Sequence, residues 1–143
     1  IYLEIDNGPY LVQPSDEAFN NGESPINLHN SNMVWLNSED VMLIKGKNGS
    51  EVSPLWGSNV HGELGGTLVK LPAGFSGVLK VDAEEFRAVI IKGNIMYESI
   101  ENKPVAGLTS GSYFDSKGKF VHRVSLLEEA LIYIRTNGTF NIL

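Results

Sequence analysis

Short apolar runs separated by turn residues make up most of this chain, and no segment keeps a helical period long enough to predict a helix. The runs are rich in β-branched and aromatic residues, and glycine, asparagine and proline stand between them. Many short strands separated by glycine turns indicate an all-β sandwich or barrel. We predict strands at residues 41–44, 52–56, 62–71, 95–99, 112–115, 120–125, 130–136 and 140–143.

Residues 71–93 form the stretch around which we expect the other strands to assemble. They are predicted to contain a turn, a strand, a short acidic loop and a second strand that ends at Gly93. Val89, Ile90 and Ile91 form a β-branched run without a polar break. We therefore expect both faces of the second strand to be buried.

The chain changes character near residue 33. Residues 1–32 carry a turn signal at 7–9 followed by polar, turn-rich sequence, and are predicted to be an extended N-terminal arm or the tail of a preceding domain. Residues 33–143 hold the clear strands and are predicted to form one β-barrel domain with its own core.

Composition and charge narrow the range of partners. The formal net charge of −6 argues against nucleic acid as a partner, and no apolar run reaches the length of a membrane span. We therefore predict a soluble protein without membrane contacts, in either the cytoplasm or the periplasm. The absence of cysteine excludes disulfides, thiolate metal sites and cysteine nucleophiles.

A resemblance to a known family is carried by residues 55–57, 70–75, 86–93 and 111–114, together with His122. These segments resemble one branch of the cupin superfamily, the RmlC-like jelly rolls. This branch is catalogued as a domain of unknown function and often occurs as two cupin domains in tandem. The resemblance implies a cupin-type jelly-roll barrel with an N-terminal extended arm.

The resemblance does not extend to the ligands of the usual cupin metal. Where the first cupin motif has two histidines and a glutamate, this chain has Lys80, Asp82 and Phe86, and of the second motif only His122 remains. The resemblance implies that these four side chains lie inside the barrel, where Lys80 and Asp82 would pair with each other or with His122. An ammonium group repels a dication, so we predict no cofactor.

Three further residues are expected to line the interior or its mouth: Trp56, Lys70 and Tyr97. The resulting prediction is a cupin-like domain with a degenerate metal site, which binds an unknown small molecule or serves as a structural partner. The alternative is an oxygenase, isomerase or lyase that binds a divalent transition metal through His122, Asp82 and Glu84. We expect a homodimer, or pairing with a second cupin domain.

Overall fold

The computed structural model describes residues 14, 16, 28–99 and 106–143. The chain divides into two compact units, Ile1–Met33 and Val34–Leu143. In the described part of the first unit, η1 (Asn30–Asn32) is a single 3₁₀ turn, capped by His29, whose Nδ1 accepts a hydrogen bond from the Ser31 amide. The turn predicted at residues 7–9 lies outside the described residues.

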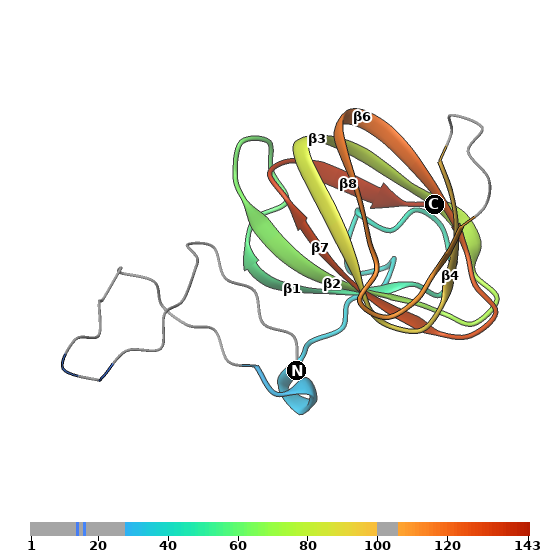
Figure 1. Ribbon diagram of the computed structural model, residues 1–143, viewed down its shortest axis with the longest axis horizontal. Helices are drawn as coiled ribbons and strands as arrows, with labels where there is room; N and C mark the ends of the chain where they lie inside the picture. The colour runs from blue at the N-terminus through green and yellow to red at the C-terminus, as the bar shows by residue number, and fades with distance from the viewer. Residues whose placement is uncertain (1–13, 15, 17–27, 100–105) are drawn as a thin grey trace. The chain divides into compact units, whose positions relative to one another are not determined.

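The second unit is an antiparallel β-structure, as the sequence predicted (Figure 1). The strands pair in the order β1-β2-β7-β3-β6-β4-β5, and β8 also pairs with β3. No helix in the described part of the chain is long and apolar enough to cross a membrane. The strands are β1 (Glu51–Gly57), β2 (Gly65–Leu71), β3 (Ser76–Lys92), β4 (Ile95–Ser99), β5 (Ala106–Leu108), β6 (Tyr113–Ser125), β7 (Ala130–Thr136) and β8 (Thr139–Ile142).

Two long strands, β3 and β6, replace pairs of shorter strands in the prediction. The acidic residues expected to form a loop in β3 instead form a bulge, because Ala83 pairs with Gly118 while Phe86 pairs with Ser116. Two hydrogen bonds at Glu85 hold this bulge: its amide donates to Asn137 Oδ1 over 2.8 Å, and its carbonyl accepts from the Thr136 hydroxyl over 3.0 Å. The loop between β7 and β8 therefore satisfies backbone groups that the bulge removes from the ladder.

The bulge changes which residues of β3 face the core. Leu79 and Val81 are buried before it, and Phe86 and Ile90 are buried after it, so the inward positions change from odd to even numbers. Beyond the bulge, only one face of the β-branched run is fully buried: Ile90 is in the core, while Val89 is half-buried. The expectation that both faces would be buried was wrong for this run.

The predicted strand at residues 41–44 is also wrong, because this segment continues a turn that begins at Asn37. The Asn37 amide donates to the Asp40 carboxylate over 2.9 Å, and the Asn37 side chain accepts from the Glu39 amide over 2.7 Å. These local side-chain bonds compete with strand pairing. Only Ile44, at the end of the segment, bridges to Ile142.

Candidate functional site

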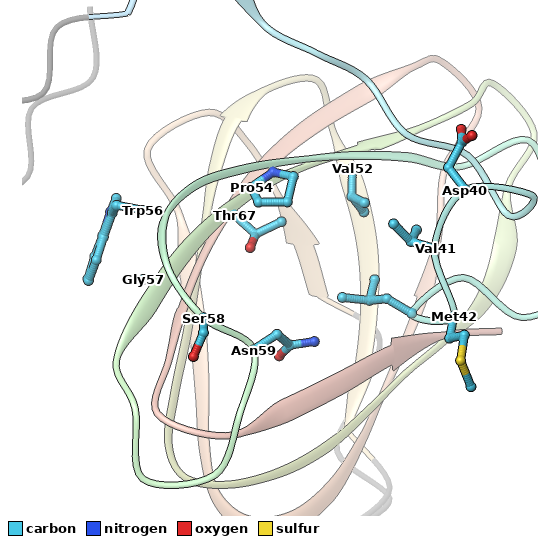
Figure 2. Close-up of a pocket in the computed structure, with 11 residues that line it drawn as sticks. Asp40, Val41, Met42, Val52, Pro54, Trp56, Gly57, Ser58, Asn59 and Thr67 are labelled. Carbon is cyan, nitrogen blue, oxygen red and sulfur yellow. The ribbon is translucent and has the colours of Figure 1, made fainter.

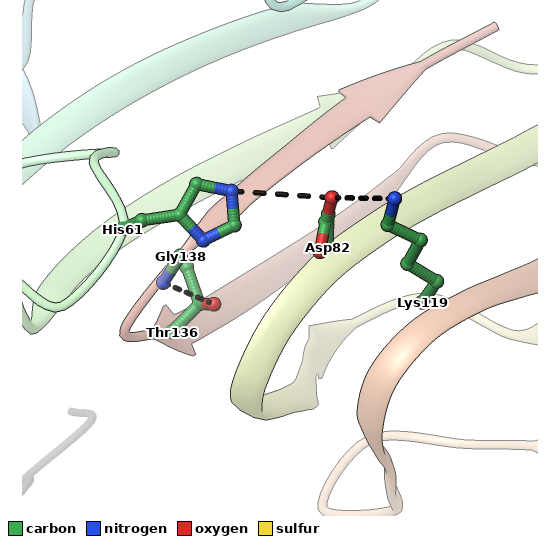
Figure 3. Close-up of polar contacts among 5 residues, drawn as sticks. All are labelled: His61, Asp82, Lys119, Thr136 and Gly138. Carbon is green, nitrogen blue, oxygen red and sulfur yellow. Dashed lines mark hydrogen bonds and ion pairs between the residues drawn. The ribbon is translucent and has the colours of Figure 1, made fainter.

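The structure separates residues that the sequence analysis placed together. Lys80 is exposed to solvent, and the side chain of Asp82 is 45% exposed. Asp82 lies on the outer surface within 3.6 Å of Lys119 Nζ and 3.9 Å of His61 Nε2 (Figure 3). The prediction that Lys80 and Asp82 lie in the interior with His122 was therefore wrong. The β3 bulge is the physical cause, because it turns even-numbered positions upstream of it outward.

Lys70 also lies outside the core-facing layer. Its ammonium group is 2.7 Å from the Glu51 carboxylate and 4.0 Å from the centre of the Trp35 ring. Its neighbours on β2, Val69 and Leu71, are the ones that enter the core. Lys70 is thus a paired outer-face cation, and its predicted interior position was wrong.

Trp56 lies past a bulge in β1 that follows Pro54. Its indole Nε1 donates to the Tyr133 hydroxyl over 3.0 Å, and both side chains pack over Gly66, where an added Cβ would lie 2.2 Å from the indole nitrogen. Only glycine fits at this position, because a larger residue would overlap the ring. Trp56 is also among the residues that line a pocket on β1 and β2.

The structure brings together three of the predicted site residues, His122, Phe86 and Tyr97. The fully buried His122 ring stacks on Phe86 with ring centres 5.1 Å apart, and it also contacts Phe114 and Phe120. The Tyr97 hydroxyl lies 2.8 Å from His122 Nδ1. Aromatic rings thus fill the interior around this histidine.

Both nitrogens of His122 have hydrogen-bond partners, since the Ser116 hydroxyl lies 3.0 Å from Nε2. A neutral imidazole has one donor and one acceptor, so one of the two hydroxyls donates and the other accepts. Burial lowers the pKa of His122 from 6.5 to about 4, which keeps the ring neutral near pH 7. Burial also raises the pKa of the Tyr97 hydroxyl, with a contribution from the charge of Asp115.

The residues present do not fit the metal that the fold family implies. Among the described residues, no three histidine, aspartate or glutamate side chains are grouped closely enough to hold an ion. Glu84 is exposed at the bulge and Asp82 is on the outer surface, so neither lies beside His122. Histidine binds metals through a free ring nitrogen, and in His122 both nitrogens face hydroxyl groups.

A pocket of about 390 Å³ opens elsewhere in the same unit, on the core-facing side of β1 and β2 (Figure 2). Its floor includes Val52, Pro54 and Thr67. In the sheet, Pro54 of β1 is paired with Thr67 of β2, and Thr67 is paired with the core residue Ile134 of β7. Residues that pair directly across a sheet share a face, and this register puts the pocket on the core side. The other lining residues are Asp40, Val41, Met42, Leu43, Trp56, Gly57, Ser58 and Asn59.

Two anchored segments form the walls of this pocket. The first, residues 36–44, is held at Leu36 by a bridge to Val52 and at Ile44 by the bridge to Ile142. The second begins at Gly57, whose φ of +65° and close approach to the Leu64 carbonyl exclude other residues. The sequence predicts a strand at residues 41–44 and assigns no element to residues 57–61, so it does not reveal the pocket. No local signal in the sequence marks the pocket, because its walls come from stretches of chain that are separated in sequence.

The strand order and the solved structures that resemble it show that the chain has the RmlC-like jelly-roll fold, the fold of the cupins. The chain belongs to the family described as "Domain of unknown function (DUF4437)", whose model matches residues 1–143. No curated protein matches the chain.

Three solved structures illustrate the likeness in fold. An acetylacetone dioxygenase from Acinetobacter johnsonii is 16% identical with a TM-score of 0.62, over 89% of this chain and 82% of that one. An RmlC-like cupin from Ralstonia eutropha is 18% identical with a TM-score of 0.59, over 82% and 71%. KdgF from Halomonas sp. is 16% identical with a TM-score of 0.57, over 76% and 92%. Identities this low establish the fold and not the activity.

Proposed function

We propose that this domain binds a small organic molecule without a metal ion, in the pocket on the core side of β1 and β2. The observation that carries the proposal is the pocket itself, whose volume of about 390 Å³ falls within the range typical of ligand sites. Its walls are mainly aliphatic, with a few polar side chains, which is the usual composition of such a site.

The surroundings of His122 support a binding function over metal chemistry. The space near this histidine is filled by Phe86, Phe114 and Phe120, and its nitrogens face two hydroxyl groups. The pocket is lined instead by residues 40–43, by β1 and the loop after it, and by Thr67, and His122 is not part of its lining. A binding site in this domain thus needs neither the histidine nor an ion.

The test is to place a larger side chain at Thr67, on the floor of the pocket, so that it fills the space. We expect neutral aromatic fragments, screened by saturation-transfer NMR, to bind the wild-type protein and Thr67→Val, which keeps the volume of the residue. Thr67→Phe should lose binding at least ten-fold, because the ring occupies the space that the ligand needs. An intact amide spectrum shows that each variant is folded. Equal binding by Thr67→Phe, or no binding by the wild type, would refute the proposal.

The alternative, a metal-dependent cupin enzyme, makes the opposite prediction about metal content. We expect protein dialysed against manganese, iron or zinc to retain well below one ion per chain, and His122→Gln to retain the same amount, because the described residues assemble no ligand set around His122. Elemental analysis measures this directly. A stoichiometric ion that disappears in His122→Gln would support the enzyme instead.

A further inference from the structure

One hydrogen-bond donor of the pocket is available to a ligand. It is the side-chain amide nitrogen of Asn59, a half-buried residue in the loop after β1. The amide oxygen is shielded from solvent and so is not part of the pocket surface. Figure 2 shows the amide nitrogen turned toward the pocket, and within the described part of the structure it makes no hydrogen bond. Its N–H groups are therefore free to meet an acceptor.

The other side-chain donors of the lining do not select a ligand in this way. The Trp56 indole N–H and the Ser58 hydroxyl each donate to a residue that does not line the pocket. The Thr67 hydroxyl can donate or accept, so it suits ligands of either kind. An amide nitrogen only donates, so Asn59 is the group that asks for an acceptor on the ligand.

The charge of the lining limits the ligand further. No lysine, arginine or histidine of the described residues lines the pocket, and its one ionisable residue is the acidic Asp40. An anionic acceptor would lose its hydration without gaining a positive partner. The aliphatic side chains of Val41, Leu43 and Val52 instead suit an uncharged apolar body.

The loop that carries Asn59 is held in place before any ligand arrives. The Gly62 amide donates to the Asn137 carbonyl over 2.9 Å, and the Glu63 amide donates to the Val60 carbonyl over 3.2 Å. Gly65 lies so close to this loop that a Cβ there would meet the Ser58 carbonyl at 2.6 Å. A donor on a loop fixed in this way loses little freedom when it binds an acceptor.

We infer that the pocket selects a neutral, mainly apolar molecule with a carbonyl or ether oxygen, which accepts a hydrogen bond from the Asn59 amide nitrogen. The inference rests on the proposed binding function and adds the class of ligand to it. The oxygen of such a ligand would meet the free donor, and its apolar remainder would cover the aliphatic walls.

The test compares acetophenone with α-methylstyrene, which has nearly the same shape but a methylene group in place of the carbonyl oxygen. The two probes differ in hydration, so the measured quantity is the change in the ratio of their affinities between variants. We expect Asn59→Leu, which removes the donor at similar volume, to shift this ratio about ten-fold against acetophenone, as the loss of one neutral hydrogen bond allows. Affinities come from amide shifts in NMR titrations.

Val60→Ala is the matched control, because Val60 belongs to the same loop but is 53% exposed and does not line the pocket. Its ratio should equal that of the wild type. Asn59→Asp is a second test variant in case Asn59→Leu does not fold. It keeps the shape of the side chain, but its carboxylate cannot donate, so the ratio should again shift against acetophenone. The amide spectrum shows whether each variant is folded.

The outcomes separate the two proposals. If neither probe binds the wild type up to its solubility limit, the binding function itself fails. If the probes bind but the ratio stays the same or moves toward acetophenone in the Asn59 variants, the pocket binds ligands and the assignment of Asn59 is overturned. An equal shift in Val60→Ala would overturn the assignment too, because the effect would then not depend on the amide.

Discussion

Replacing Leu79 by alanine is expected to lower the free energy of unfolding by about 2–5 kcal/mol, the range for large-to-small changes in a core. Leu79 is fully buried and belongs to the hydrophobic core. The change would remove apolar contacts and leave a cavity that the surrounding strands only partly close. Urea unfolding followed by tryptophan fluorescence measures the difference.

Lys80→Ala is the matched control, one residue further along the same strand. Lys80 is exposed, so this change should alter the free energy of unfolding by no more than about 0.5 kcal/mol. The two variants together test which residues of β3 face inward before the bulge. A larger loss for Lys80→Ala than for Leu79→Ala would mean that Lys80 and Asp82 occupy the interior after all.

The stability of the protein should fall steeply as the pH is lowered from about 6.5 to about 4, because of His122. The native histidine has its pKa lowered to about 4 by burial, whereas the unfolded residue binds a proton near pH 6.5. Between these values the unfolded state holds more protons, so the free energy of unfolding rises with pH. The contribution of His122 is complete above about pH 6.5, and roughly 3 kcal/mol of it is lost by about pH 4.

Carboxylates titrate in part of the same range, so the effect is measured as a difference between variants. His122→Gln cannot take up this proton, and its unfolding free energy should depend less on pH between about 4 and 6.5 than that of the wild type. His61→Gln is the control, because its side chain is 60% exposed. Parallel pH profiles for the wild type and His122→Gln would show that His122 is not the group responsible.

Part of the aromatic cluster around His122 was within reach of sequence reasoning, because alternation along one strand places Phe120 on the same face as His122. Phe120, His122 and Val124 are two residues apart on β6 and therefore share one face of the strand. Phe86 and Ile90 likewise share one face of β3 beyond its bulge. All of these positions except His122 carry apolar side chains. The buried nitrogens of His122 form hydrogen bonds with the hydroxyl groups of Tyr97 and Ser116. The family resemblance also indicated the correct fold, the cupin-type jelly roll. It could do so because the glycines and apolar strands that define this fold can be recognised in short stretches of sequence.

The pocket could not be predicted in the same way. It is bounded by residues 40–43, by the loop after Gly57 and by Thr67, which are separated in sequence and meet only after β1 and β2 pair. The apolar residues at 41–44 resemble a strand because nothing in their order shows that Asn37 and Asp40 close a turn beside them. Likewise, an asparagine in a polar loop gives no sign that its carbonyl will be buried.

The sequence by itself determined an all-β chain, the family to which it belongs and the shared face of Phe120, His122 and Val124, because these follow from residue type and a period of two. The tertiary structure alone decided that Lys80 and Asp82 face outward. That outcome depends on a single extra residue in β3, whose backbone is satisfied by Thr136 and Asn137 from a distant part of the chain. A bulge of this kind is stabilised by pairing between distant strands, so the local pattern of β3 does not reveal it.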